Sequence, residues 1–373
     1  MSLLPLACLL YCALWLAFVG RITWRLAHRV GAAAPAPLPA ALPQVSILLA
    51  ARNEEAALPR CLASIRALNY PPHQLEVLLG DDASTDRTRA VAEAAMQGFA
   101  GRFEVVPIAS QLGQARGKAN VLAHLARRAR GEYFFITDAD ISLPTSWLQA
   151  MLSYAAPGVG TVTGLTVVEG AAPLARFQGL DWLLSLAMGQ VASDSGQPMT
   201  AMGNNMLVTR AAYQVTGGYE TLPFSVTEDF ALFEAVNARG FGFRQVFEPR
   251  VRAASLPAPT WGALLRQRLR WMHGVASLPA KVQAALVFFN CYWLALTGLL
   301  LAGQPGWVLA GLGAKIGLLA LTSRAATRRA GLPLPAAWLV GSFEFYALAL
   351  LTELTLRRLL GSRRVSWKGR TYA

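Results

Sequence analysis

The sequence predicts an α/β protein with a mostly parallel sheet and transmembrane helices at both ends of the chain. Of its 373 residues, 54% are hydrophobic and only 15% are charged. Long apolar segments lie near both ends, and short apolar strands alternate with helical segments between them. Strands that alternate with helices are typical of a parallel sheet covered by helices on both faces.

Residues 1–30 are predicted to form a transmembrane anchor, because residues 2–19 carry no charge and are long enough to span a bilayer. The nearby basic residues follow this apolar stretch: Arg21, Arg25, His28 and Arg29. A cleaved signal peptide would carry basic residues before it. The positive-inside tendency therefore places the N-terminus outside and the following domain in the cytoplasm. Residues 31–43, rich in Pro and Ala, are expected to be a linker.

Residues 44–258 are predicted to form the α/β domain. The expected strands are 44–50, 75–80, 103–108 and 133–137, and the expected helices between them are 54–68, 84–95 and 116–130. In such sheets ligands bind at the carboxyl ends of the strands. Two acidic pairs follow strands at this edge: Asp81 with Asp82, and Asp138 with Asp140.

Asp138 and Asp140 come directly after an apolar strand, where two carboxylates repel each other and resist burial. Hard divalent cations take carboxylate oxygens and substrate phosphates as ligands. A bound metal would remove the repulsion and recruit a diphosphate. A solvated acidic turn is the alternative, and the short pattern by itself does not exclude it.

The C-terminal part is expected to contain an interfacial helix at 259–283, then membrane segments and a basic tail at 284–373. The apolar segments of this part are 284–302, 306–322 and 336–356. If all three spanned the membrane, the basic tail would lie outside, against the positive-inside tendency. We therefore expect that one of the last two segments does not span, 336–356 in preference to 306–322, and that it forms an interfacial or re-entrant helix.

Two charged residues within these segments support that expectation. Lys315 and Glu344 lie inside apolar stretches, where an unpaired charge at a helix centre costs roughly 2.5–3.5 kcal/mol. Such residues usually pair or face protein, so Lys315 and Glu344 are a candidate pair.

The basic residues also indicate which partners to expect. The net charge is +13, and many of the arginines flank apolar segments, which suits anionic headgroups and lipid phosphates. No basic patch is interleaved with aromatic residues, so the membrane is the expected partner and nucleic acid is not.

Several motifs between about residues 45 and 275 occur in the order of one known family. They are VSILLAARNEEAALPRCLASI, EVLLGDDASTDRT, GKANVL, TDADISLP, TED (227–229) and QRLRW (267–271). Together they resemble the family 2 glycosyltransferases, inverting enzymes of the Rossmann-like GT-A fold, although Ala83 stands where that family most often has Gly. The ending SWKGRTY (366–372) resembles the tail of the membrane-bound ceramide glucosyltransferase group.

The resemblance implies a donor site for a nucleotide sugar. Ala50, Arg52 and Glu54 would form one wall of its base pocket. Asp81 and Asp82 would form the other wall, and Asp82 would accept a hydrogen bond from the base. Capping of the following helix is an alternative role for this acidic pair.

The resemblance also assigns the diphosphate and the metal. Lys118 would lie near the diphosphate, a role favoured because a helix start binds anions well; a solvated basic helix is the alternative. Asp138 would face the ribose and, together with Asp140, hold Mg²⁺ or Mn²⁺.

On the acceptor side, Asp229 of the TED motif is the candidate general base, because an inverting displacement needs a carboxylate that takes the acceptor's proton. The alternative is that it only caps the helix 230–239. Asn204 and Asn205 are further candidates for contact with the acceptor.

In the QRLRW motif, Arg270 suits the departing diphosphate, since a guanidinium matches phosphate oxygens in a fork geometry. Trp271 offers an apolar face to the acceptor, and Gln267 offers a hydrogen bond. The alternative is an amphipathic helix whose Arg and Trp residues face lipid headgroups.

We therefore expect an integral membrane glycosyltransferase with a cytoplasmic catalytic domain, in the cell membrane. Its donor would be UDP-glucose or a related UDP-sugar, and its acceptor a membrane lipid. A processive polysaccharide synthase is the alternative, although it would need more spans than the three candidates here. A second alternative is an inactive sugar-nucleotide-binding scaffold, against which the intact Asp140, Asp229 and Arg270 argue.

Overall fold

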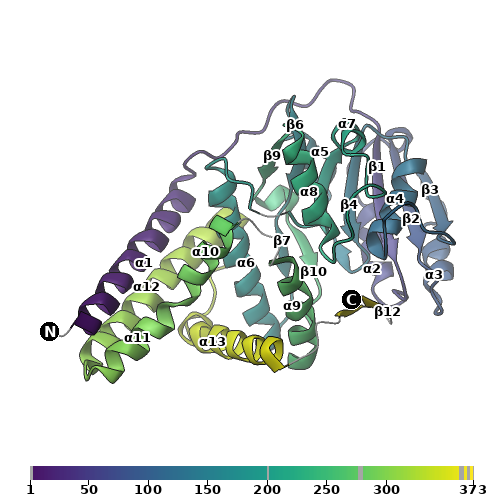
Figure 1. Ribbon diagram of the computed structural model, residues 1–373. Helices are drawn as coiled ribbons and strands as arrows, with labels where there is room; N and C mark the ends of the chain where they lie inside the picture. The colour runs from purple at the N-terminus through teal and green to yellow at the C-terminus, as the bar shows by residue number, and fades with distance from the viewer. Residues whose placement is uncertain (1–2, 200, 276–279, 361–364, 368–369, 373) are drawn as a thin grey trace.

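The computed structural model describes residues 3–199, 201–275, 280–360, 365–367 and 370–372. An α/β domain with its sheets forms one end of the molecule, and a group of long helices extends from it (Figure 1). These helices come from both ends of the chain, as the sequence predicts.

The central sheet has seven strands in the order β3–β2–β1–β4–β8–β6–β9. Their bounds are β1 (Val45–Ala51), β2 (Leu75–Asp81), β3 (Arg102–Pro107), β4 (Tyr133–Asp138), β6 (Val159–Thr163), β8 (Asn205–Thr209) and β9 (Gly242–Gln245). Only β8 runs antiparallel to its neighbours, so the expected mostly parallel sheet is confirmed. A second, three-stranded sheet, which the sequence did not suggest, pairs β5 (Ile141–Ser142), β10 (Ala253–Ser255) and β7 (Thr166–Val168).

Helices cover both faces of the central sheet. One face carries α2 (Leu58–Arg66), α3 (Thr88–Ala95) and α5 (Trp147–Leu152), and the other carries α4 (Lys118–Arg128), α7 (Arg210–Val215) and α8 (Glu228–Ala238). Successive residues of β1 enter opposite cores: Ile47 and Leu49 pack under α2, whereas Leu48 packs under α4. A strand buried on both faces needs a continuous apolar run, which explains the composition of this segment.

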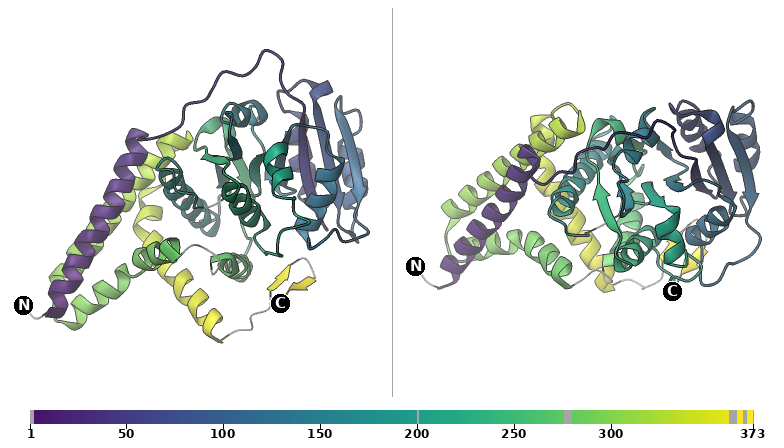
Figure 2. Two further views of the ribbon diagram at one scale, coloured as in Figure 1. Left: turned by 45° about the horizontal axis from the view of Figure 1, so that its top comes forward. Right: turned by 90° about the horizontal axis from the view of Figure 1, so that it is seen from above.

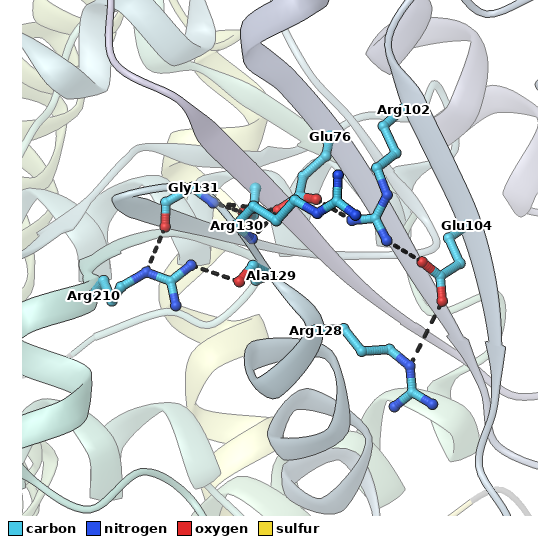
Figure 3. Close-up of polar contacts among 9 residues, drawn as sticks. Glu76, Arg102, Glu104, Arg128, Ala129, Arg130, Gly131 and Arg210 are labelled. Atoms are coloured by element: carbon cyan, nitrogen blue, oxygen red, sulfur yellow. Dashed lines mark hydrogen bonds and ion pairs between the residues drawn. The ribbon is translucent and has the colours of Figure 1, made fainter.

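The buried carboxylate of Glu76 links the amino ends of neighbouring strands (Figure 3). Glu76 of β2 is 1% exposed and accepts hydrogen bonds from the Ser46 hydroxyl and the Gly131 backbone, and it forms an ion pair with Arg102. Because a buried charge is costly unless it is fully paired, these partners hold β1, β2, β3 and the start of β4 together. This cluster lies at the opposite end of the strands from the acidic pairs, so it serves the fold.

The long helices are α1 (Leu3–His28), α10 (Ala280–Asn290), α11 (Tyr292–Leu301), α12 (Pro305–Ala330) and α13 (Ala337–Leu360). Within the described residues, four stretches have the length and composition to cross a membrane: Leu3–His28, Val282–Leu301, Pro305–Ala330 and Ala337–Leu359. In Figures 1 and 2, α1 lies beside α11 and α12 and its N-terminus points away from the α/β domain.

Helix α13 takes a different course. It diverges from α12 and packs against α6 (Pro173–Ser193) and α9 (Trp261–Val275), which adjoin the α/β domain (Figure 2). Its Glu344 carboxylate lies 2.7 Å from the Lys315 ammonium of α12, so the expected pair is confirmed. The rings of Trp15, Tyr292 and Trp293 surround the same ammonium, with centroids 5.0–5.3 Å away.

Candidate functional site

A cavity of about 950 Å³ opens at the carboxyl ends of β1, β2 and β4. Its lining includes twelve of the fourteen site residues expected from the sequence: Ala50, Arg52, Glu54, Asp82, Lys118, Asp138, Asp140, Asn204, Asp229, Gln267, Arg270 and Trp271. Parallel strands bring their carboxyl ends to one edge of the sheet, so residues far apart in the chain meet there. The register shows this directly, because Ala50 pairs with Gly80 on one side and with Asp138 on the other.

Asp81 is one of two expected residues that do not line the cavity. Its carboxylate accepts a hydrogen bond of 3.0 Å from the Ser84 backbone N–H and thereby caps the turn after β2. Asp82, which is 4% exposed, does line the cavity, and its carbonyl oxygen accepts a hydrogen bond from the Arg52 guanidinium. The N-cap residue of α3 is Arg87, without a side-chain cap hydrogen bond, so the helix-capping role expected for this acidic pair is not seen in the described residues.

The turn after β2 explains the glycine preference at position 83. Ala83 has φ +54°, a conformation in which a Cβ atom is strained and glycine is favoured. Asn53 in the facing turn has φ +53°, which asparagine tolerates better than most residues. The Asn53 side chain accepts a hydrogen bond of 2.8 Å from the Thr85 backbone, so the two turns support each other.

Lys118 lies between Asp138, which is expected on the donor side, and Glu228, which precedes the candidate base. Its ammonium lies 2.6 Å from Asp138 and 3.0 Å from Glu228, the residue before Asp229. Burial by itself would lower the pKa of Lys118, but attraction to Asp138 and Glu228 outweighs it and raises that pKa. The lysine follows Gly117, whose φ of +56° turns the chain into α4. The side chain is thus a fixed cation among carboxylates.

Asp140 lies in an environment that disfavours its charge. Burial raises the pKa of Asp140 to about 6, and repulsion from Asp138 and Glu54 adds to the shift. Arg60 of α2 donates a hydrogen bond of 3.1 Å to the Asp140 backbone carbonyl and holds the loop after β4 in place. In the described parts of the chain, no three His, Cys, Asp or Glu residues form a metal site. The pair Asp138 and Asp140 would therefore need phosphate oxygens to complete a metal's ligands.

Asp229 is held by backbone groups on both of its carboxylate oxygens. The Gly203 N–H donates a hydrogen bond of 2.6 Å to Oδ2, and the Phe230 N–H donates one of 2.8 Å to Oδ1. A Cβ atom on Gly203 would lie only 2.7 Å from the Asp229 Cβ, so this approach requires glycine. Asp229 lies in the first turn of α8, where a negative charge is stabilised, and it also lines the cavity.

Helix α9 brings Gln267, Arg270 and Trp271 to the cavity. Across the part of the chain that the structure describes, no carboxylate forms an ion pair with the Arg270 guanidinium. A guanidinium on the cavity lining matches phosphate oxygens, which is the role that the resemblance implies for Arg270.

Arg268, within the same motif, was not expected from the sequence to matter. Its guanidinium forms an ion pair with Asp181 of α6 and lies over the Trp271 ring, 4.5 Å from the ring centroid. The Trp182 ring packs against the same Trp271 ring, with the two ring centroids 5.4 Å apart. Asp181 is a lone acidic residue in the apolar stretch GLDWLLSLAMG, and this pattern could have indicated a buried partner.

The two asparagines expected on the acceptor side differ. Asn204 lines the cavity, and its side-chain oxygen accepts a hydrogen bond of 3.0 Å from Thr166. Asn205 is fully buried, and its amide bonds to Trp147, Leu165 and Val251. Asn205 therefore joins the two sheets and does not face a ligand, which corrects the expectation for this residue.

Comparison with known proteins gives a family-level match. The sequence pattern of glycosyl transferase family 21 matches residues 9–373. The chain is 27% identical over 235 residues to the β-monoglucosyldiacylglycerol synthase of Synechocystis sp., covering 62% of this chain and 48% of that protein. It is 26% identical over 234 residues to the poly-β-1,6-N-acetyl-D-glucosamine synthase of Staphylococcus epidermidis, covering 62% and 54%. The chain spans about half the length of these curated relatives.

Among solved structures, the fold is similar to that of the mannosyltransferase PcManGT from Pyrobaculum calidifontis, determined in complex with GDP-Man and Mn²⁺. The TM-score is 0.63 at 21% identity, and the alignment covers 95% of this chain and 99% of that one. The similarity confirms the expected GT-A fold.

Proposed function

The chain belongs to glycosyl transferase family 21, and we propose that it transfers a sugar from a nucleoside-diphosphate sugar to a membrane lipid. The observation that carries the proposal is the single cavity in which the expected donor, metal and acceptor residues meet. The same cavity reaches α1 and α10, two of the apolar helices. An acceptor that resides in the membrane could therefore approach the donor directly.

The donor is bound by its base and by its diphosphate. Arg52 and Asp82 form the base wall, where buried polar groups can read the edge of a nucleobase. Arg270 and Lys118 supply the positive charge for the diphosphate. Lys118 would then exchange part of its attraction to Asp138 and Glu228 for the phosphate oxygens.

A divalent cation, Mg²⁺ or Mn²⁺, fits the remaining acidic residues. Burial, with repulsion from Asp138 and Glu54, raises the pKa of Asp140 and makes its charge unfavourable, and a cation would relieve both effects. When bound, the metal neutralises charge on the leaving diphosphate. Asp140, with Asp138, would hold it.

The transfer is a single displacement. The oxygen of the acceptor hydroxyl attacks the anomeric carbon, and the bond from that carbon to the diphosphate oxygen breaks with its electron pair leaving on the diphosphate. The hydroxyl proton passes to a carboxylate oxygen of Asp229, whose orientation is held by Gly203 and Phe230. Arg270 stabilises the charge that develops on the diphosphate.

Similarity to a β-monoglucosyldiacylglycerol synthase favours a glucose donor, such as UDP-glucose, and a lipid acceptor. Similarity to a poly-β-1,6-N-acetyl-D-glucosamine synthase keeps a processive polysaccharide synthase as the second candidate. We place the catalytic domain in the cytoplasm, because the basic residues Arg21, Arg25 and Arg29 lie at the end of α1 that adjoins this domain.

The test is to incubate membranes that contain the protein with a panel of labelled nucleotide sugars and to analyse the lipid extract. Transfer to a lipid predicts one labelled glycolipid of fixed mobility, whereas a ladder or a polymer would favour the polysaccharide synthase. Asp229→Asn should slow transfer by about 10²–10⁴-fold without loss of donor binding, because only the proton acceptor is removed. Glu234→Gln, a change on the same helix outside the cavity, is the matched control.

A further inference from the structure

The cavity continues beyond the catalytic carboxylates into an apolar arm between three helices. The arm is lined by Phe18 and Ile22 of α1, Leu186 of α6, and Val282, Leu286 and Phe289 of α10. No step of the transfer uses these residues. We propose that this arm holds an acyl chain of the acceptor lipid, which enters sideways from the membrane between α1 and α10. The inference rests on the proposed function.

The lining has a polarity that matches a lipid. Along α1, the cavity-lining residues change from Phe18 to Arg21 and Arg25 toward the α/β domain. Along α10, the lining residues run from Val282, near the catalytic helix α9, to Phe289, farther along the apolar helix. An acyl chain packed between Phe18 and Phe289 would therefore place the polar head of the lipid beside Arg21 and Arg25, with the lipid hydroxyl toward Asp229.

Aromatic side chains of α1 and α10 meet beside the arm. The rings of Phe18 and Phe288 meet edge to face with centroids 5.8 Å apart, and they join α1 to α10 at this point. Phe18 remains 42% exposed on a helix whose length and composition suit a membrane span. Aromatic side chains change rotamer without backbone movement, so this contact can part for a lipid chain.

The cavity is large for a single small molecule. Pockets that bind one small molecule measure roughly 300–1,000 Å³, and this cavity lies at the upper end with about 950 Å³. A nucleotide sugar occupies the polar part near β1, β2 and β4, and the apolar arm remains for the acceptor. The chemical class is a neutral or anionic lipid with a free hydroxyl and at least one long acyl chain.

Two tryptophan substitutions on α10 test the proposal. Ala285 lines the arm, so Ala285→Trp should fill it, whereas Val287 is 62% exposed and Val287→Trp should not. Because the indole would occupy the space of the acyl chain, Ala285→Trp should lower kcat/KM for dioleoylglycerol in vesicles by about 10- to 100-fold. Binding of the nucleotide sugar should remain unchanged in both variants. Equal lipid transfer by the two variants would overturn the inference.

A measurement on the unmodified protein covers the case in which Ala285→Trp does not fold. A diacylglycerol that carries a photoreactive diazirine at the end of one chain should label the peptide that contains residues 282–289, and unlabelled dioleoylglycerol should compete. Labelling elsewhere, without labelling of this peptide, would place the acceptor at another site. If the unmodified protein glycosylates no lipid at all, the proposed function fails; if it does so but α10 is unlabelled, only this inference fails.

Discussion

The backbone N–H of Gly203 donates a hydrogen bond of 2.6 Å to the carboxylate of Asp229, across a separation of 26 residues. The contact exists because Gly203 has no side chain: a Cβ atom there would lie 2.7 Å from the Asp229 Cβ. The segment before β8 thereby fixes the candidate base at the start of α8.

Gly203→Ala should therefore displace Asp229 and slow transfer. A shift of about 1 Å at a reacting group can reduce the rate by about 10²-fold, and donor binding should change little. The measurement is kcat for lipid glycosylation beside the dissociation constant of the nucleotide sugar. Gly20→Ala on α1, where an added Cβ meets nothing within 4 Å, is the control. Full activity of Gly203→Ala would show that the base tolerates displacement.

Metal binding should depend on pH through Asp140. The pKa of Asp140 is raised to about 6 by burial and by its acidic neighbours, so below pH 6 the carboxyl holds a proton that a cation must displace. Affinity for Mn²⁺ should fall about tenfold per pH unit below 6, with no contribution from this group above pH 7. Calorimetric titration with MnCl₂ between pH 5 and 8, in the presence of UDP, measures this.

Two further measurements complete the test of the metal site. Asp140→Asn should remove most of the Mn²⁺ binding together with its dependence on pH, and EDTA should abolish transfer by the unmodified protein. A constant affinity from pH 5 to 8, or full activity in EDTA, would contradict the assignment of Asp140 as a metal ligand.

The ion pair of Arg268 and Asp181 should position Trp271 and its neighbours in the cavity. The two side chains are only 15% and 24% exposed, and burial raises the pKa of Asp181 although Arg268 opposes the shift. Asp181→Asn should destabilise the protein, since breaking a buried pair costs about 3–5 kcal/mol and a partly exposed pair costs less. It should also lower kcat more than it raises the KM of the donor.

A matched double variant separates charge from packing. Replacing both partners, with Asp181→Leu and Arg268→Met, should restore thermal stability in detergent relative to Asp181→Asn, because no unpaired charge remains. It should not restore kcat if the stacking of Arg268 on Trp271 orients the ring. Equal kcat for the double variant and the unmodified protein would assign the pair to stability alone.

Helix α13 should return to the side of the membrane that holds the catalytic domain. Glu344, near its start, pairs with Lys315, which lies about 22 Å before the end of α12 at a rise of about 1.5 Å per residue. Farther along α13, Leu350 and Leu354 pack against α6 and α9. From Trp338 onward the helix thus packs along α6 and α9, beside the catalytic domain, as an interfacial helix would.

Cysteine labelling measures this course in a background without native cysteines. A cysteine at position 358 should react with a membrane-impermeant maleimide only after the cells are opened. Gln304→Cys, in the connection between α11 and α12 at the far end of the bundle, should react in intact cells. Reaction at position 358 in intact cells would instead mean that α13 spans the membrane.

The sequence predicts those site residues whose place in the fold follows from the residues next to them in the chain. An apolar strand followed directly by Asp138 and Asp140 indicates a carboxyl edge wherever that strand lies in the sheet, and Asp82 follows β2 in the same way. Because parallel strands share one edge, the meeting of these residues in one cavity needed no knowledge of the side chains between them. The candidate pair Lys315 and Glu344 was predictable for a similar reason, since a charge in an apolar helix needs a partner.

The sequence by itself therefore determined the order of strands and helices as far as β4, the acidic edge of the sheet and the apolar helices at both ends. Tertiary structure alone decided that Asp81 caps a turn while Asp82 lines the cavity, that Lys118 lies between Asp138 and Glu228, and that α6 supplies Asp181 to the QRLRW helix. Periodicity and motif spacing report each segment's own preference for strand, helix or membrane. These contacts join segments that are far apart in the chain, and they form only after packing has brought the side chains within hydrogen-bonding distance.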